Sequence, residues 1–466
     1  MPEAITLIPS AERLIASLRD IGYDATTAVA DLVDNSIAAD ATTVAVDLAF
    51  EGPASWVRIT DNGRGMSGDT LDEALRFGSR RPYAANELGR FGLGLKTASL
   101  SQCRRLTVAT RQTGQAQIEI RQWDMDHVER TDAWEALRLA ADMCRPEWVE
   151  PLQRGPGTVV VWDQLDRMSS FKIPDGKAAH SALGRLCRDI EEHLAMVFHR
   201  FLAGEARRRL PLRILINGND IEAWDPFARI ECATQALEPQ PLRFQHEGQS
   251  HTVLVTPYVL PQEAEFSSPA AHARAAGPNK WNHQQGFYVY RNDRMIQSGG
   301  WNRIRTPDEH TKLARIALDF TSGADAAFGI NVAKMRVLLP GEIRNCLNVI
   351  ASGVVSRANA AYRRRDEAPG ARSAISGRAP VQRSPAHASS AAVSGRSALD
   401  DSEPIRGEEA LSPARAVAGN LADSIVRILM RELSDESEML ERVLTALGEE
   451  HPDIRAAARR ARAATA

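Results

Sequence analysis

The residues best suited to chemistry lie in a glycine-rich stretch, residues 89–99 (GRFGLGLKTAS). Gly92 and Gly94 carry no side chain, so the backbone there can approach an anion closely. A helix predicted from about residue 93 to residue 101 would direct free N–H groups and the positive end of its dipole towards that anion. Lys96 adds a positive charge. The stretch is a candidate phosphate cradle, although its spacing is not that of a P-loop. The alternative is a loop that only turns the chain.

A carboxylate and an amide lie one helical turn apart at Asp31 and Asn35. Side chains at this spacing point the same way on a helix. Asp61 follows a predicted strand and precedes a glycine-containing turn, residues 62–66 (NGRGM). The end of a strand is a common position for a ligand-binding carboxylate. These residues could bind a ligand, or they could be an exposed polar helix face and a turn carboxylate.

The elements that must position these groups are predicted from hydrophobic periodicity, which indicates an α+β fold. In the first 205 residues, strands are predicted at 43–50, 56–60, 105–111, 117–123 and 159–162. Helices are predicted there at 11–21, 24–39, 70–77, 93–101, 131–148 and 179–202. The polar stretch 78–88 is typical of a mobile lid. A second domain is predicted to start near Leu210, with strands at 212–216, 252–260 and 314–320, a hairpin at 286–291 and 294–297, and a helix at 341–365.

The C-terminal part of the chain differs in composition. Residues 366–419 are rich in Ala, Ser, Pro, Gly and Arg, which predicts a disordered basic linker. An arm that attracts nucleic acid is the alternative. Residues 420–466 are predicted to be helical, with an apolar stripe that must be buried on this chain or on another.

The composition excludes several classes of protein. The net charge of −3 over 466 residues gives no general attraction to nucleic acid or to a membrane. No apolar run approaches the ~18 residues that a membrane span needs, and the first residues do not resemble a signal peptide. The five cysteines lie far apart without metal-ligand spacing, which suits a reducing compartment. A cytoplasmic protein is therefore expected.

The order of the motifs resembles that of the GHKL superfamily (gyrase B, chaperone, histidine kinase and MutL), with the closest similarity to MORC-like prokaryotic ATP-binding proteins. The resemblance depends on residues 31–35 (DLVDN), 61–66 (DNGRGM), 89–96 (GRFGLGLK) and 157–158 (GT). It implies a Bergerat-type α/β sandwich that binds ATP, followed by a ribosomal-protein-like βαβ transducer domain. The domains expected are an ATP-binding domain at 1–205, a transducer domain at 206–365, the linker at 366–419 and a C-terminal helical segment at 420–466.

The resemblance also implies a role for individual residues. Asp31 would be the general base and Asn35 a ligand of Mg²⁺. Asp61 would accept a hydrogen bond from the adenine amino group, supported through water by Thr158. Lys334, in a loop of the second domain, would contact the γ-phosphate. The other residues implied to bind the nucleotide, at the adenine pocket or the phosphates, are Gly63, Gly65, Met66, Gly89, Phe91, Gly92, Leu93, Gly94, Leu95, Lys96 and Thr97.

Two positions depart from the family pattern. The family's Asp-Ala pair after the asparagine is Ala38-Ala39 here, with the acid at Asp40, which puts no primary contact in doubt. The family's base is usually a glutamate, whereas this chain has Asp31, whose side chain is one methylene shorter and reaches roughly 1.5 Å less. A misplacement of about 1 Å can lower a rate by on the order of a hundredfold. Hydrolysis is therefore expected to be slow, and a position that does not support hydrolysis is the alternative.

These features predict a Mg²⁺-dependent ATPase that dimerises when ATP binds and acts as a clamp on DNA or on a partner protein. A partner protein could bind the C-terminal helix, and genome maintenance or defence is the expected setting. The alternative is a nucleotide-binding regulatory subunit with negligible hydrolysis. A histidine kinase is disfavoured, because residues 1–23, before the Asp31 helix, contain no histidine to accept a phosphoryl group.

Overall fold

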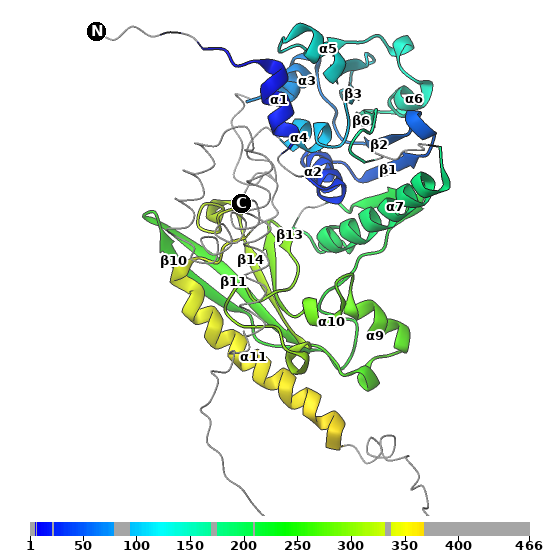
Figure 1. Cartoon of the computed structure of the whole chain (residues 1–466). Coiled ribbons are helices and arrows are strands. Elements are labelled where there is room, and N and C mark those ends of the chain that lie inside the picture. Colours follow the sequence, from blue (N-terminus) through cyan, green and yellow to red (C-terminus); the bar gives the residue numbers. More distant parts are fainter. Residues whose placement is uncertain are drawn as a thin grey trace, which may run out of the picture. The chain divides into compact units, whose positions relative to one another are not determined.

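The computed structural model describes residues 5, 7–20, 23–78, 94–168, 175–207, 210–330 and 337–367. All of these residues lie within one compact unit, Met1–Arg378. The unit is a mixed α+β structure with two sheets (Figure 1). Among the helices described, none has the length and apolar character needed to cross a membrane.

The first sheet has eight strands in the order β5-β4-β3-β6-β2-β1-β7-β8. All neighbours are antiparallel except β1 and β7, which are parallel. The strands are β1 (Thr43–Ala49), β2 (Trp56–Asp61), β3 (Arg105–Arg111), β4 (Glu119–Asp124), β5 (Leu137–Arg138), β6 (Gly157–Asp163), β7 (Arg213–Ile216) and β8 (Asn219–Asp220).

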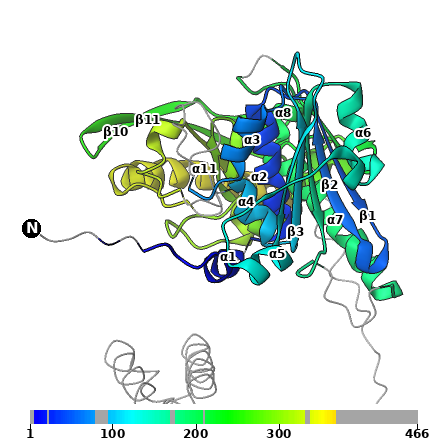
Figure 2. The ribbon, with the colours of Figure 1, turned by 90° about the horizontal axis from the view of Figure 1, so that it is seen from above.

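Both faces of the first sheet are covered, which explains why β6 is buried throughout. Val160 and Trp162 point into the larger core, whereas Val159 and Val161 point into a smaller one on the opposite face, as the two-residue period of a strand requires. Figure 2 shows α2 and α4 on one side of this sheet and α6 on the other. The helices of this part are α1 (Ala11–Arg19), α2 (Ala25–Ala38), α3 (Gly68–Leu75), α4 (Gly94–Leu100), α5 (Met125–Thr131), α6 (Pro146–Arg154), α7 (Lys177–Val197) and α8 (His199–Leu202).

Helix α2 carries two of the predicted site residues, Asp31 and Asn35. Asp24 caps its start, because one carboxylate oxygen accepts a 2.8 Å hydrogen bond from the backbone N–H of Thr27, an arrangement that satisfies a free N–H of the first turn. Val29, Leu32 and Val33 are buried in the larger core. The helix contacts both α4 and α7, so almost all of its middle is enclosed.

The second sheet contains β10 (Gln240–His246), β11 (Gln249–Val259), β14 (Ala314–Phe320), β12 (Gly286–Arg291) and β13 (Arg294–Gln297) in that order, and β9 (Gln235–Ala236) pairs with β11. Only β12 and β14 pair in parallel. Helix α11 (Gly341–Glu367) lies along this sheet (Figure 1), and Ile343, Leu347 and Val354 contribute to its core. The remaining elements are α9 (Pro269–Ala276), α10 (Lys280–His283) and 3-10 helices at Gly52–Ala54, Ala141–Met143, Glu263–Glu265, Glu309–Thr311 and Ser322–Ala324.

Two predictions about local structure were wrong. Residues 131–148 do not form a helix: α5 ends at Thr131, a short strand follows, and α6 starts at Pro146, a residue well suited to the first turn because it lacks an N–H. The strand predicted at 212–216 was assigned to the second domain, but β7 pairs beside β1 in the first sheet.

Candidate functional site

Asp31 lies in the interior, where α2 meets the start of α4. Only 3% of its surface is exposed, and the hydroxyl of Tyr23 donates a 3.1 Å hydrogen bond to its Oδ2. A Cβ atom added to Gly94 would lie 3.6 Å from the same oxygen. The structure thus brings the predicted base and the described end of the glycine-rich stretch together. The alternative interpretation of this face of α2 as exposed is wrong for Asp31.

A second buried carboxylate lies on the same helix. Asp34 is 2% exposed, and its two oxygens lie 3.0 and 2.8 Å from Nε of Arg294 in β13. Nη2 of Arg294 lies 3.7 Å from Oδ1 of Asp31. An arginine of the second sheet therefore contacts both carboxylates.

Asp61 ends β2 and is held by donors from several directions. Its Oδ1 accepts a 2.8 Å hydrogen bond from the backbone N–H of Gly63, and its Oδ2 accepts one of 3.0 Å from the Ser36 hydroxyl on α2. Thr158 is its partner across the β2–β6 strand pair, and the Thr158 backbone N–H lowers the pKa of Asp61. Burial raises the pKa of Asp61 in spite of these donors. A carboxylate offers about four acceptor positions, so Asp61 can accept a further hydrogen bond from a ligand.

Thr158 and Met66 meet at the side chain of Thr110. The hydroxyls of Thr110 and Thr158 are 3.2 Å apart, and the backbone N–H of Met66 donates a 3.0 Å hydrogen bond to the Thr110 hydroxyl. The structure therefore brings together two predicted residues of the adenine pocket, Met66 and Thr158, through a threonine that no motif indicates.

The backbone conformation and the close contacts beside Asp61 require glycine at two positions. Gly65 has a φ of +65°, and a Cβ atom there would lie 2.0 Å from the carbonyl oxygen of Arg111. Gly157 has a φ of +150°, and its Cβ atom would lie 2.0 Å from the carbonyl oxygen of Asp61. Gly63 is also crowded, with the carbonyl oxygen of Ala39 2.7 Å from its added Cβ atom. A side chain at any of these positions would displace the turn that carries Asp61.

Asn35 is exposed on α2, one turn after Asp31. Its amide oxygen is a hard donor of the kind that Mg²⁺ accepts, and Mg²⁺ often takes only one or two protein ligands beside phosphates and water. Within the described part of the chain, no group of three His, Cys, Asp or Glu residues could hold a metal ion. The residues present therefore fit a metal bound mainly through phosphates, and they do not fit a cage made of protein alone.

Lys96 does not have the position expected of a lysine that binds phosphates. Its side chain is buried, and Nζ donates a 2.7 Å hydrogen bond to the carbonyl oxygen of Ala74 in the last turn of α3. The ring centre of Phe77 lies 6.0 Å from Nζ. Burial lowers the pKa of Lys96 to about 8, although the charge of Glu73 acts in the opposite direction.

The other predicted residues divide into two groups. Leu95 is partly buried and Thr97 fully buried in α4. Gly89, Phe91, Gly92, Leu93 and Lys334 lie outside the described residues, as do residues 79–88 of the predicted lid.

Four residues that touch the site did not come from motif spacing: Tyr23, Ser36, Thr110 and Arg294. Ser36 directly follows Asn35 in the helix, so its place beside the site could have been predicted from the sequence. The other three come from separate elements, and no local pattern connects them with Asp31 or Asp61.

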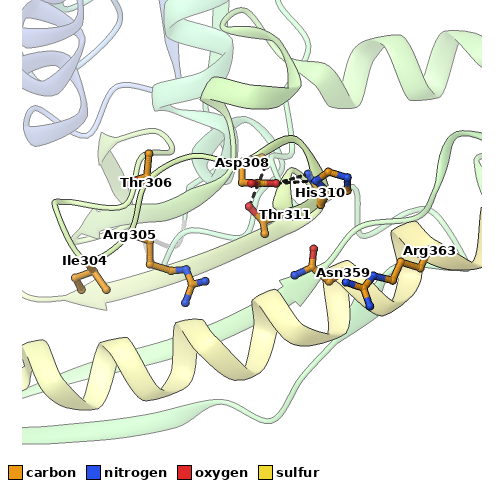
Figure 3. A pocket seen from close by; sticks show the side chains of 8 residues that line it. All are labelled: Ile304, Arg305, Thr306, Asp308, His310, Thr311, Asn359 and Arg363. Carbon is orange, nitrogen blue, oxygen red and sulfur yellow. Dashed lines mark hydrogen bonds and ion pairs between the residues drawn. The ribbon is translucent and has the colours of Figure 1, made fainter. Parts of the chain in front are cut away.

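A cavity of about 660 Å³ lies between the loop 304–311 and α11, on the second sheet's side of the molecule. Figure 3 shows Arg305, Asp308 and His310 facing Asn359 and Arg363 of α11 across it. None of the predicted nucleotide-binding residues lines this cavity. It is therefore separate from the site around α2.

Comparison with known proteins agrees with the motifs. Residues 23–155 match the family described as histidine kinase-, DNA gyrase B-, and HSP90-like ATPase. The chain is 39% identical over 80 residues to Protein MICRORCHIDIA 5 of Arabidopsis thaliana and 31% identical over 88 residues to ATPase morc-1 of Caenorhabditis elegans. The aligned stretches are 16% and 19% of this chain and only 11% and 10% of those relatives. The predicted resemblance to GHKL and MORC proteins is confirmed for this part of the chain.

Proposed function

We propose that this chain, whose residues 23–155 are of the GHKL ATPase type, is a Mg²⁺-dependent ATPase that acts as a nucleotide-controlled switch. The observation that carries the proposal is the grouping of Asp31, Asn35 and Asp61 around one helix, with Gly94 at the start of α4 beside Asp31. Adenine would lie at Asp61, Met66 and Thr158. The triphosphate would extend past Asn35 towards Gly94.

Recognition of adenine is supported by the geometry of Asp61. Its carboxylate is fixed by hydrogen bonds from Gly63 and Ser36, so it can accept from an exocyclic amino group without losing its own orientation. Guanine presents a carbonyl oxygen where adenine presents that amino group, and two acceptors facing one another repel. Asp61 would therefore select adenine.

Asp31 would act as the base in hydrolysis. It would accept a proton from a water molecule whose oxygen bonds to the γ-phosphorus, while the bond from that phosphorus to the bridging oxygen breaks. ADP would leave with that electron pair, and inorganic phosphate would form. Positioning and charge stabilisation dominate such transfers. Asn35 would hold Mg²⁺, which neutralises charge on the phosphates when it is bound.

The proposal includes assembly. Ile5, Leu7 and Ile8 are 75%, 82% and 78% exposed before α1, which supports a role for the N-terminal segment in bringing two protomers together when ATP is bound. Lys334 and the predicted lid would contact the γ-phosphate and so respond to its presence. The client would be DNA, through the basic linker, or a partner protein, through the C-terminal helical segment.

A regulatory subunit that binds ATP without turnover is the second candidate, favoured by the short reach of Asp31. Calorimetry with ATP and magnesium, together with turnover by the wild type and Asp31→Asn, separates the two. Binding with Asp31-dependent turnover supports the ATPase, and binding without turnover supports the subunit. No heat of binding, with Asp61→Ala leaving all activity intact, would overturn both. Mass measured with a non-hydrolysable ATP analogue, with and without duplex DNA, tests the clamp, which predicts a doubling of mass with the analogue.

A further inference from the structure

Arg294 connects the second sheet to the helix that carries the predicted base. It is the first residue of β13 and is 2% exposed. Its Nε lies within hydrogen-bonding distance of both oxygens of Asp34, and its Nη2 lies 3.7 Å from Asp31. Its guanidinium carbon lies 5.8 Å from the ring centre of Phe198. One side chain therefore contacts two acidic residues of α2 that are three positions apart.

The contact of Arg294 with Asp31 and Asp34 is electrostatic as well as steric. Asp31 and Asp34 are on the same face of α2 and both are buried, and like charges at this spacing repel each other. Arginine can meet both, because its planar guanidinium carries several donors in a fixed fork. With Nε on Asp34, Nη2 is the atom directed at Asp31. A lysine could not hold this double geometry, because it offers a single charged nitrogen.

The strand pair that carries Arg294 is fixed at several points. Arg291 on β12 pairs with Asp325 at 2.7 Å, and both side chains are buried. Asp293, in the turn, accepts a 2.9 Å hydrogen bond from the backbone N–H of Arg207. Tyr290 lies 2.9 Å from Nε2 of His199 on α8. A displacement of this hairpin would therefore move the guanidinium of Arg294 relative to α2.

We propose that Arg294 is a positioning residue for ATP hydrolysis: it holds Asp31 in place through the paired Asp34, so that the position of the β12–β13 hairpin controls turnover. The inference rests on the proposed function. It makes the second sheet a regulator of the base itself, through a residue that lies outside the motifs of the nucleotide site.

The test compares two conservative variants, one on the hairpin and one away from it. Arg294→Lys keeps the charge and loses the fork, and Arg105→Lys does the same on β3 of the first sheet, where Arg105 also contacts two carboxylates, those of Asp124 and Asp163. Both are expected to lower the melting temperature. Only Arg294→Lys is expected to lower kcat, by about tenfold or more, with the Kd for ATP changed by less than about threefold, since small displacements of a reacting group cost orders of magnitude in rate. Turnover is measured well below each melting temperature.

A second variant tests the inference in case Arg294→Lys folds poorly. Asp34→Asn weakens the attachment of Arg294 without touching Asp31, and it is expected to lower kcat in the same way. The inference fails if Arg294→Lys and Asp34→Asn hydrolyse ATP at the wild-type rate, or if Arg105→Lys loses as much kcat. Those results leave the proposed function intact. A wild type that binds no ATP, or binds it without turnover, removes the ATPase and this inference together.

Discussion

The hydroxyl of Tyr23 donates a 3.1 Å hydrogen bond to Oδ2 of Asp31, from a position just before α2 begins. The contact is buried, with Tyr23 only 7% exposed. Burial and the neighbouring carboxylate raise the pKa of Tyr23 far above its ordinary value. The phenol therefore stays protonated and remains a donor over the whole range in which the protein can be studied.

Removing this donor should destabilise the protein and reduce turnover. Tyr23→Phe leaves a buried carboxylate oxygen with one donor fewer, and hydrogen bonds to charged groups contribute about 1.5–3 kcal/mol. Unfolding in urea should therefore show a loss of about 1–3 kcal/mol. The matched comparison is the double variant Tyr23→Phe with Asp31→Asn. If the two losses simply add, the hydroxyl and the carboxylate are not coupled and this interpretation is wrong.

Glycine substitutions should separate activity from folding. A Cβ atom at Gly94 would make an ordinary 3.6 Å contact with Oδ2 of Asp31, whereas one at Gly65 would lie 2.0 Å from a backbone oxygen. Gly94→Ala should keep the wild-type melting temperature within a few degrees and lose most ATP turnover, because the methyl group occupies space beside the base. Gly65→Ala should fail to fold stably. Circular dichroism melts and a phosphate-release assay measure the two effects, and full turnover by Gly94→Ala would contradict the assignment of that space to substrate.

Much of the fold follows from patterns that are local in the chain. The hairpin of β12 and β13 and strand β14 have the bounds that alternation and the Asn292-Asp293 turn predict. Helix α2 has the predicted extent because Asp24 is a strong cap and its apolar residues keep a helical period. The motifs around Asp31 and Asp61 identify the family for the same reason, since each is short and ordered along the chain.

The errors come from interactions between distant segments. A strand pattern does not say which sheet it joins, so the strand predicted at 212–216 was assigned to the second domain, whereas β7 pairs with β1 in the first sheet. Amphipathicity predicts a solvated face wherever carboxylates cluster, but Asp34 is buried, and Arg294, 260 positions later, pairs with it. The helix predicted at 131–148 runs through Pro146, although a proline there marks the start of a helix, α6.

Stability should fall below about pH 6.5 because of two histidines. Burial lowers the pKa of His193 to about 4 and also lowers that of His199. A depressed pKa means that the folded state binds the proton less well than the unfolded state, so the contribution is present above the unfolded value of 6.5 and is lost as the pH falls. The free energy of unfolding measured in urea should fall by on the order of 4 kcal/mol between pH 7.5 and pH 5, about 2 kcal/mol for each histidine. His193→Gln should remove about half of this dependence, and His180→Gln, at an exposed position, should not; equal slopes in both variants would contradict the prediction.

Lys96 provides a test of whether the buried ammonium moves to the phosphates. Burial lowers its pKa to about 8 in the position where it contacts Ala74, and an ammonium that transfers to a triphosphate would have its pKa raised by the added negative charge. ATP binding at pH 8 should then take up about half a proton, whereas binding at pH 6.5 should take up close to none from this group. Calorimetric heats in two buffers of different ionisation enthalpy measure this uptake, and Lys96→Met should abolish it. A heat that does not depend on the buffer at pH 8 would mean that Lys96 stays on α3 and that the phosphates are held by other groups.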